Sequence, residues 1–336
     1  MRKILKMTKF ESSNHSRDNN LEGLQHQQMK EDNETWTNTF FILGFGGCQE
    51  LQILFFCCFL LIYLVALTGN LLIVAIVCLN THLHTPMYFF LTNLSCLDII
   101  CTTLVFPRML TSFFLGGSYV SRSECLLQMY CFHSMLSTEC ILLAVMAFDR
   151  YVAICNPLRY STIMNTNMCI LLAAGTWLVG LLEVMPYTVL ISRFSFCGSH
   201  TINHFLCDMT PLLKLSCTST QTIITLTYIL GPLGGVVPFG LIAVSYIKII
   251  SSILKIQSTE GRQKAFSTCA SHLTVVILYY VSLCFTYMRP ASTYSKYNDK
   301  LMSLLYIAVT PLCNPIIYSL KNKEFKKAIR KSKIMA

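Results

Sequence analysis

Seven long apolar blocks follow one another along the chain, and they constrain the fold more than any other feature of the sequence. The first has no charged side chain and exceeds the ~20 residues that a helix needs to cross the hydrocarbon core of a bilayer. Only 12% of the chain is charged, about half the share of a soluble domain, which argues against a cytosolic enzyme or a disordered regulator. The sequence predicts an all-α membrane protein, a seven-transmembrane helix bundle. The predicted spans are Leu51–Leu79, Met87–Phe106, Cys125–Phe148, Ile170–Leu190, Thr218–Ile247, Ala265–Met288 and Leu301–Leu320.

Basic residues set the orientation of these spans. Lys and Arg gather in the tail after Leu320 and between Lys248 and Lys264, and cytoplasmic segments carry the excess of such residues. We therefore expect an extracellular tail at residues 1–50, a transmembrane domain at 51–320 and a cytoplasmic tail at 321–336. The net charge of +10 fits anionic lipid headgroups or a cytoplasmic protein partner. Nucleic acid is disfavoured, because no basic run alternates with stacking aromatics outside a span.

The predicted outer segments carry two kinds of modification site. Asn14 and Asn33 each open an N-glycosylation pattern, and we favour Asn33. Residues 1–28 hold no apolar run and so are not a signal peptide, which leaves the first span as the targeting signal. Four of the seventeen cysteines lie outside, where oxidising conditions favour disulfides. Their three possible connectivities stay open at this point. They are Cys125, Cys197, Cys207 and Cys217.

Four sequence blocks together carry a family resemblance. They read LHTPMYFFL from Leu83, MAFDRYVAIC from Met146, KAFSTCASHL from Lys264 and PLCNPIIYSLKN from Pro311. In this order, over about residues 40–330, the chain resembles the odorant receptors, a branch of the rhodopsin-like G-protein-coupled receptors. It departs from the usual pattern only at single positions, and the stretch that opens at Met29 looks like a usual start for this family. We therefore expect translation to begin at Met29.

The resemblance implies a switch at the inner end of the bundle. Arg150, between Asp149 and Tyr151, is expected to be paired at rest and to meet the G protein when released, with the loop Asn156–Thr162 and the segment Lys255–Lys264 beside it. Tyr246 and Tyr318 are its expected partners in the active state. A proline in the seventh span frees a backbone carbonyl and bends the helix there. The remaining expected switch residues are Lys264, His272, Asn314 and Pro315. Residues 322–333 are expected to form a short amphipathic helix, with an unstructured basic tail as the alternative.

Asp98 and Glu139 are acids in the middle of apolar spans. An ionisable side chain is costly to bury inside a membrane, so such a residue by default suggests a functional site. We expect them to face each other. With Asn70, Ser95 and Asn314 they would either hold a sodium ion or a proton with waters, or form a polar network without an ion. No other cofactor or metal is expected.

The resemblance also implies a ligand pocket in the outer half of the bundle. Disulfides Cys125–Cys207 and Cys197–Cys217 would hold the second outer loop over it as a lid, with His204, Leu206 and Asp208. His133 would lie roughly 12 Å below the outer end of its helix, at 1.5 Å rise per residue. Apolar and aromatic side chains with a few polar groups suit such a pocket. The candidate ligand-binding residues are Phe132, His133, Leu136, Ser137, Phe205, Thr227, Leu230, Gly231, Gly234, Tyr280, Leu283, Tyr287, Leu304 and Ile307.

Glu183 is an acid in the fourth span that belongs to none of these motifs. We expect it either to reach the pocket or to bond a neighbouring helix. No acid stands on the pocket side of the third span to pair with an amine, since Phe132 and His133 occupy that region. The sequence therefore favours a neutral or weakly polar guest.

Other functional classes have weaker support. No metalloprotease motif, phosphate-binding glycine loop or nucleophile set is present, so we expect no enzyme. A transporter or channel would have only Asp98 and Glu139 in its favour, without the internal repeats such proteins show. A receptor of the same architecture for a peptide, lipid or amine is the nearest rival, and the blocks at Leu83 and Lys264 argue against it. We expect an odorant receptor in the plasma membrane of olfactory cilia, which raises cyclic AMP through the olfactory stimulatory G protein.

Overall fold

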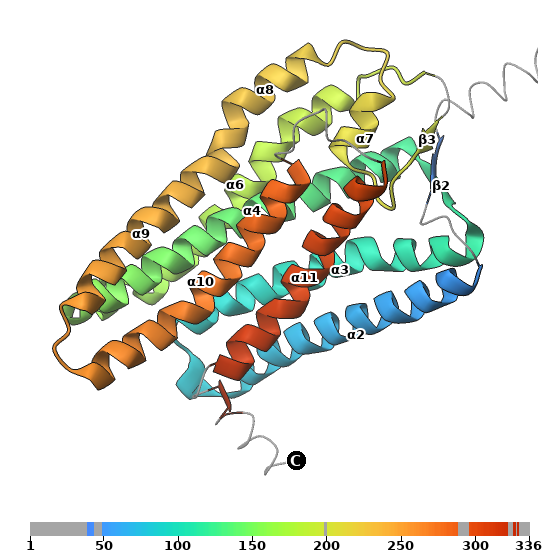
Figure 1. Ribbon diagram of the computed structural model, residues 1–336. Coiled ribbons are helices and arrows are strands. Elements are labelled where there is room, and N and C mark those ends of the chain that lie inside the picture. Colours follow the sequence, from blue (N-terminus) through green and yellow to red (C-terminus); the bar gives the residue numbers. More distant parts are fainter. Residues whose placement is uncertain are drawn as a thin grey trace, which may run out of the picture.

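A computed structural model of the chain describes residues 39–43, 49–197, 200–287 and 296–321, together with residues 325, 326 and 328 (Figure 1). Its long helices run side by side as a bundle. They are α2 (Gln49–Leu79), α3 (Pro86–Leu115), α4 (Arg122–Cys155), α6 (Thr166–Ile191), α8 (Gln221–Gly231) continued by α9 (Val237–Leu254), α10 (Thr259–Tyr287) and α11 (Lys296–Lys321). Asn14, Met29 and Asn33 lie outside the described residues, as does most of the expected helix at 322–333.

Six spans among the described residues are long and apolar enough to cross a membrane. The seventh, α11, contains the shorter apolar stretch Tyr306–Tyr318. Each predicted block lies on one of these elements, so the predicted seven-helix architecture is confirmed. Many large apolar side chains of α2 and α6 are exposed, such as Leu61, Leu72 and Leu182. Such outward apolar surface is expected where lipid replaces water around a bundle.

Two spans differ in detail from the sequence prediction. α3 continues through Pro107 to Leu115 and ends at Gly116, which adopts the left-handed conformation (φ 66°) that favours glycine at a helix end. The fifth span is interrupted by the π-helical turn η3 (Pro232–Val236) between α8 and α9. Hydrophobicity alone predicts neither feature, because both depend on backbone geometry inside an apolar block.

α4 is the central helix of the bundle. It contacts α3, α6, α9 and α10, and its buried side chains include Glu139 and Gln128. Its first turn is closed by a capping box, in which Ser121 accepts from the Glu124 amide and the Glu124 carboxylate accepts from the Ser121 amide. α4 therefore links the outer loops to the inner end of the molecule.

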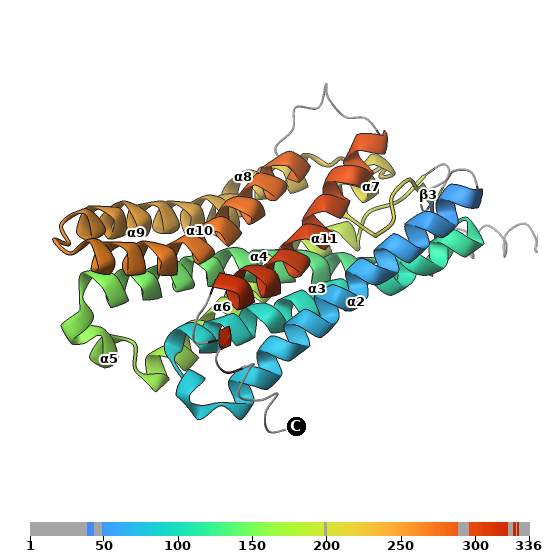
Figure 2. The ribbon, with the colours of Figure 1, turned by 60° about the horizontal axis from the view of Figure 1, so that its bottom comes forward.

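A small sheet closes the outer end of the bundle. β1 (Thr39–Ile42) pairs antiparallel with β2 (Ser118–Ser121) and parallel with β3 (Thr201–Ile202), in the order β2-β1-β3. The buried ring of Phe40 contacts the Phe196 ring edge-on, with centroids 5.1 Å apart. The short helix α7 (Met209–Lys214) follows β3. At the opposite end the chain forms η1 (Thr81–Leu83), η2 (Pro157–Arg159) and α5 (Tyr160–Ile163), the last visible in Figure 2.

Candidate functional site

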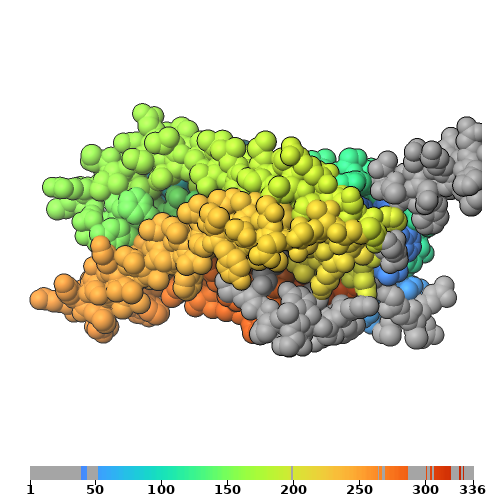
Figure 3. All heavy atoms as spheres, turned by 90° about the horizontal axis from the view of Figure 1, so that it is seen from above, coloured from blue at the N-terminus to red at the C-terminus, as the bar shows by residue number. Residues whose placement is uncertain are grey.

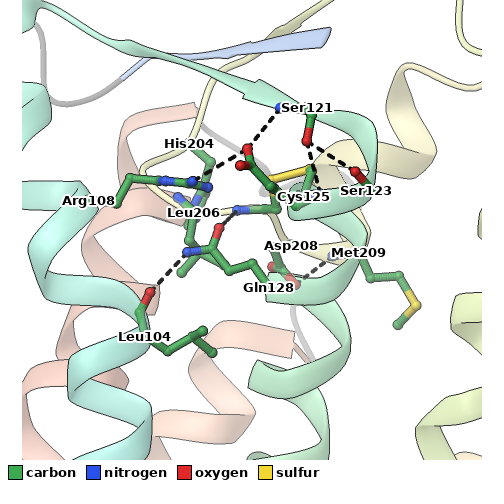
Figure 4. Close-up of a disulfide and its surroundings, with 12 residues drawn as sticks. Leu104, Arg108, Ser121, Ser123, Cys125, Gln128, His204, Leu206, Asp208 and Met209 are labelled. Atoms are coloured by element: carbon green, nitrogen blue, oxygen red, sulfur yellow. Dashed lines mark hydrogen bonds and ion pairs between the residues drawn. A yellow bond between two sulfur atoms is a disulfide. The ribbon is translucent and has the colours of Figure 1, made fainter. Parts of the chain in front are cut away.

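The second outer loop is tied to α4 by a disulfide and by an amide beside it. Cys125 and Cys207 are bonded, with Cα atoms 5.3 Å apart. The Cys207 amide donates to Gln128 Oε1 (3.1 Å), while Gln128 Nε2 donates to the Leu104 carbonyl of α3 (3.1 Å) (Figure 4). Sequence reasoning missed Gln128, although a buried amide one turn from Cys125 in an apolar span signals a partner. The structure also pairs Cys197 with Cys217.

One turn further along α4, His133 reaches the same loop. Its Nε2 lies 3.1 Å from Asp208 Oδ1, and its Nδ1 lies 3.0 Å from the Met129 carbonyl. Because a carbonyl only accepts, Nδ1 carries a proton, and a second proton on Nε2 makes an ion pair with the carboxylate. Burial raises the pKa of Asp208, but the hydrogen bond and charge of His133 outweigh burial, so this pKa lies below its usual value.

His204 occupies the centre of the loop as a neutral ring. Its Nδ1 accepts from the Leu206 amide (3.3 Å), and its Nε2 lies 3.3 Å from Ser303 Oγ on α11. Burial, with a smaller contribution from the nearby Lys300 charge, lowers the pKa of His204 to about 4. The ring is therefore uncharged near neutral pH and bonds both its own loop and α11.

Five of the predicted pocket residues are buried in one apolar cluster, and two more pack against it. The cluster brings together the loop, α4, α10 and α11. These seven residues are Phe132, Leu136, Phe205, Tyr280, Leu283, Leu304 and Ile307. An aromatic layer continues the cluster inward, with Phe132 against Tyr306 (centroids 6.2 Å) and Tyr306 against Tyr279 (5.7 Å). Sequence reasoning missed Tyr279 and Tyr306.

The predicted pocket residues of the fifth span are not among the apolar residues of that cluster. Leu230 packs instead against the outer apolar cluster that contains Phe40 and Tyr187. The Thr227 hydroxyl donates to its own helix at the Ile223 carbonyl (2.9 Å). Gly231 ends α8, and Gly234 lies in the π turn beside Glu183 of α6. The Glu183 carboxylate also accepts a hydrogen bond from Ser137 of α4. The side chain of Tyr287 lies outside the described residues.

The predicted ion-site residues lie in the middle of the bundle. Asn314 Nδ2 donates to Asp98 Oδ2 (2.9 Å), and the Tyr306 hydroxyl donates to Glu139 Oε2 (3.2 Å). Asp98 and Glu139 are electrostatic neighbours. Three buried oxygens of these ion-site residues have no hydrogen-bond partner among the described residues, namely Asn70 Oδ1, Ser95 Oγ and Glu139 Oε1. Buried polar atoms of this kind call for water or a cation, and oxygen donors suit a hard cation.

The bend in α11 is tied to α2. Pro315 has no amide hydrogen, so the carbonyl four residues earlier, at Pro311, loses its helical partner. Asn70 Nδ2 donates to that carbonyl at 3.0 Å. Gly69 permits this approach, since a Cβ there would lie 3.0 Å from Pro315 Cγ.

The inner end of α4 holds the predicted switch residues. Arg150 Nε donates to Asp149 Oδ2 (3.0 Å), and the Tyr160 hydroxyl of α5 donates to Asp149 Oδ1 (2.8 Å). The Tyr246 hydroxyl lies 2.7 Å from His272 Nδ1. The buried Tyr318 hydroxyl has no hydrogen-bond partner within the described part of the chain. In this state Arg150 is therefore paired with its neighbour. Tyr151 is half-buried, and the Lys264 side chain lies outside the described residues.

Comparison with known proteins shows that the chain is similar in sequence to olfactory receptors. A family model described as "Olfactory receptor" matches residues 58–335. Olfactory receptor 6Y1 of Homo sapiens is 46% identical over 90% of this chain and 93% of its own length. Olfactory receptor 1A1 of Pan troglodytes is 46% identical over 90% of this chain and 97% of its own. Squid rhodopsin, at 18% identity, superposes with a TM-score of 0.68 over 85% of this chain and 82% of its own, which supports the fold.

Proposed function

The chain belongs to the olfactory receptor family of rhodopsin-like G-protein-coupled receptors, and on that premise we propose that it detects a small, neutral volatile molecule in the outer half of the bundle. Members of this family are multi-pass membrane receptors, so the prediction that the chain is not an enzyme is confirmed. Odorants and G proteins are the partners that membership implies in general.

One observation supports the location of the pocket most strongly. Phe205 of the lid, Phe132 of α4 and Tyr280 of α10 are buried in the same apolar cluster as Leu304 and Ile307 of α11. A mostly apolar site with few polar groups is what a volatile guest requires. The guest activates the protein by binding the active packing better than the resting one, which shifts the population toward the active state.

The signal passes inward along α4 and reaches the G protein at its inner end. The aromatic layer joins Phe132 to Tyr306, whose hydroxyl bonds Glu139. At the inner end, release of Arg150 from Asp149 lets it meet the G protein, with Tyr246 and Tyr318 turning toward it. The loop 156–162 and the segment 255–264 complete the contact, and the partner is the olfactory stimulatory subunit, which raises cyclic AMP.

A sodium ion fits the polar site in the middle of the bundle. Asp98, Glu139 and Asn314 would hold it together with Ser95 and Asn70, and the ion would supply positive charge between two buried carboxyl groups. The buried oxygens without partners support this assignment. A network of waters without an ion is the alternative, and titration of the purified protein with sodium distinguishes the two.

The remaining assignments concern localisation, glycosylation and the cytoplasmic tail. The protein acts in the plasma membrane of olfactory cilia, carries glycan on Asn33 and, less favourably, Asn14, and lays residues 322–333 on the inner leaflet as a basic amphipathic helix. Peptide mapping of the mature protein tests the glycan.

Cyclic AMP measurement tests the function. Cells that express the protein with the olfactory stimulatory subunit are screened against volatile compounds, beside Arg150→Ala and His133→Ala variants of equal surface expression. The proposal predicts a response that Arg150→Ala abolishes and whose ranking of odorants His133→Ala changes. A response that survives Arg150→Ala unchanged contradicts it.

A further inference from the structure

Glu183 of α6 is an acid in an apolar span that the proposed activation route does not use. Its helix turns exposed apolar side chains such as Leu182 and Met185 outward and buries Gly180, Val184 and Tyr187. Glu183 itself is half-buried, at the edge of the buried face. Acids in such positions are costly to keep and mark functional sites by default.

The Glu183 carboxylate joins three spans. Ser137 Oγ of α4 donates to Glu183 Oε2 (2.5 Å), and the backbone of Gly234 in the π turn makes a second hydrogen bond to the carboxylate. Ser137 and Gly234 are both predicted pocket residues, on different spans. Figure 3 shows α6 and the fifth span side by side on one face of the molecule, in agreement with the contacts between α6 and α8.

Two glycines make room for this carboxylate. A Cβ at Gly180 would overlap the Thr138 hydroxyl and press on the backbone of α4, so glycine lets α6 approach α4 closely. Glu183, one turn along, then reaches Ser137 beside Thr138. A Cβ at Gly234 would overlap the carboxylate itself. The π turn places the Gly234 backbone, which carries no side chain, against the Glu183 carboxylate. π turns inside helices are frequent at functional sites.

We propose that Glu183 is the polar specificity group of the odorant pocket and that it selects alcohols, by accepting a hydrogen bond from the odorant hydroxyl. The inference rests on the proposed function. A carboxylate offers about four acceptor positions, and Ser137 and Gly234 occupy two of them. Leu136, next to Ser137, packs against the apolar cluster that would hold the carbon skeleton.

The chemistry distinguishes an alcohol from its close relatives. An aldehyde or a methyl ether of the same skeleton has an oxygen but no O–H, so it cannot donate a hydrogen bond to the Glu183 carboxylate. The odorant oxygen then faces the negative charge of the carboxylate. A hydrogen bond to a charged group is worth about tenfold or more in affinity. The hydroxyl therefore decides the ranking within a set of odorants of equal carbon skeleton.

The test measures cyclic AMP concentration–response curves for straight-chain, branched and aromatic alcohols, each paired with the aldehyde and the methyl ether of its skeleton. Wild type is expected to respond to alcohols at concentrations about tenfold lower than to the matching ethers. Glu183→Met, which keeps the length and removes the carboxylate, brings the two curves together. Gly234→Ala has the same effect, because its methyl group displaces the carboxylate.

Gly235→Ala is the matched control, since a Cβ at Gly235 in the same π turn meets nothing within 4 Å; it keeps the preference for alcohols. Surface labelling and the response to ethers show that each variant is folded. An alcohol-to-ether ratio that Glu183→Met leaves unchanged overturns the inference and leaves the proposed function standing. Silence toward every compound from protein at the cell surface contradicts the proposed function, and the inference with it.

Discussion

His133 Nε2 of α4 lies 3.1 Å from Asp208 Oδ1 of the second outer loop. The carboxylate also accepts from the Met209 amide at 2.7 Å and so caps α7. One buried carboxylate therefore fixes both the loop helix and the side chain predicted to reach the pocket. The pair sits next to Cys207, which makes the loop a rigid part of the outer bundle.

The His133–Asp208 pair can be measured by a double-mutant cycle. Asp208→Asn and His133→Asn are each expected to lower the stability of the purified protein by about 2 kcal/mol, because each leaves a buried charged partner without its counter-charge. The double variant should lose less than the sum of the two. Thermal midpoints in detergent check this, and strictly additive losses would show that the two side chains do not interact.

His204 predicts a pH dependence of the lid. The pKa of its folded form is about 4, below the ordinary value of about 6.5, so between these values the unfolded state binds more protons. Stability therefore falls as pH drops from about 6.5 toward 4, by up to about 1.4 kcal/mol per pH unit.

A variant isolates this effect. His204→Gln keeps a polar side chain but cannot take the proton, so its thermal midpoint should fall less than that of wild type over the same pH range. Asp208, whose pKa lies below its usual value, responds only at the acid end of that range. Parallel curves for the two proteins would contradict the assignment of a neutral buried ring.

Two glycines of α6 are expected to behave oppositely. Gly180→Ala places a methyl group against Thr138 and forces α6 from α4, at a cost of about 1–3 kcal/mol. Gly175→Ala meets nothing within 4 Å and should be neutral or stabilising by up to about 1 kcal/mol through helix propensity. Thermal midpoints of the two variants give the comparison, and equal losses would refute the close approach at Gly180.

Asn70 is expected to matter for the bend in α11. Asn70→Leu leaves the Pro311 carbonyl buried without its donor and should cost about 1–3 kcal/mol. Thr68→Ala, which removes only side-chain hydrogen bonds within α2, serves as the control and should change stability by about 0.5 kcal/mol or less. A stable Asn70→Leu protein would show that the carbonyl has another partner.

The spans were predictable because hydrophobic blocks of this length have few alternatives in a bilayer. The sheet at the outer end was not predictable, because β1 pairs with β2 and β3, which both lie far along the chain from it. No local sequence pattern encodes such pairing. The π turn at Pro232–Val236 was also hidden, because its residues are as apolar as the helix around them.

The candidate site was predictable only at residues that belong to a recognisable sequence motif. Spacing predicts that His133 lies below Cys125 on the same helix, yet its partner Asp208 depends on where the loop folds back after Cys207. Leu230 has the expected hydrophobicity, but it faces the outer cluster rather than the one that contains Phe132. The direction of a side chain around a helix is set by packing, which a single sequence does not record.

The central claim is that an odorant bound in the outer half of the bundle activates a G protein at the inner end. The most direct measurement is nucleotide exchange by purified olfactory stimulatory G protein, with the receptor in lipid nanodiscs and an odorant that evokes cyclic AMP in cells. The account predicts faster exchange with odorant, lost in Arg150→Ala. Exchange that the odorant does not change, or odorant-independent ion currents through the protein, would contradict it.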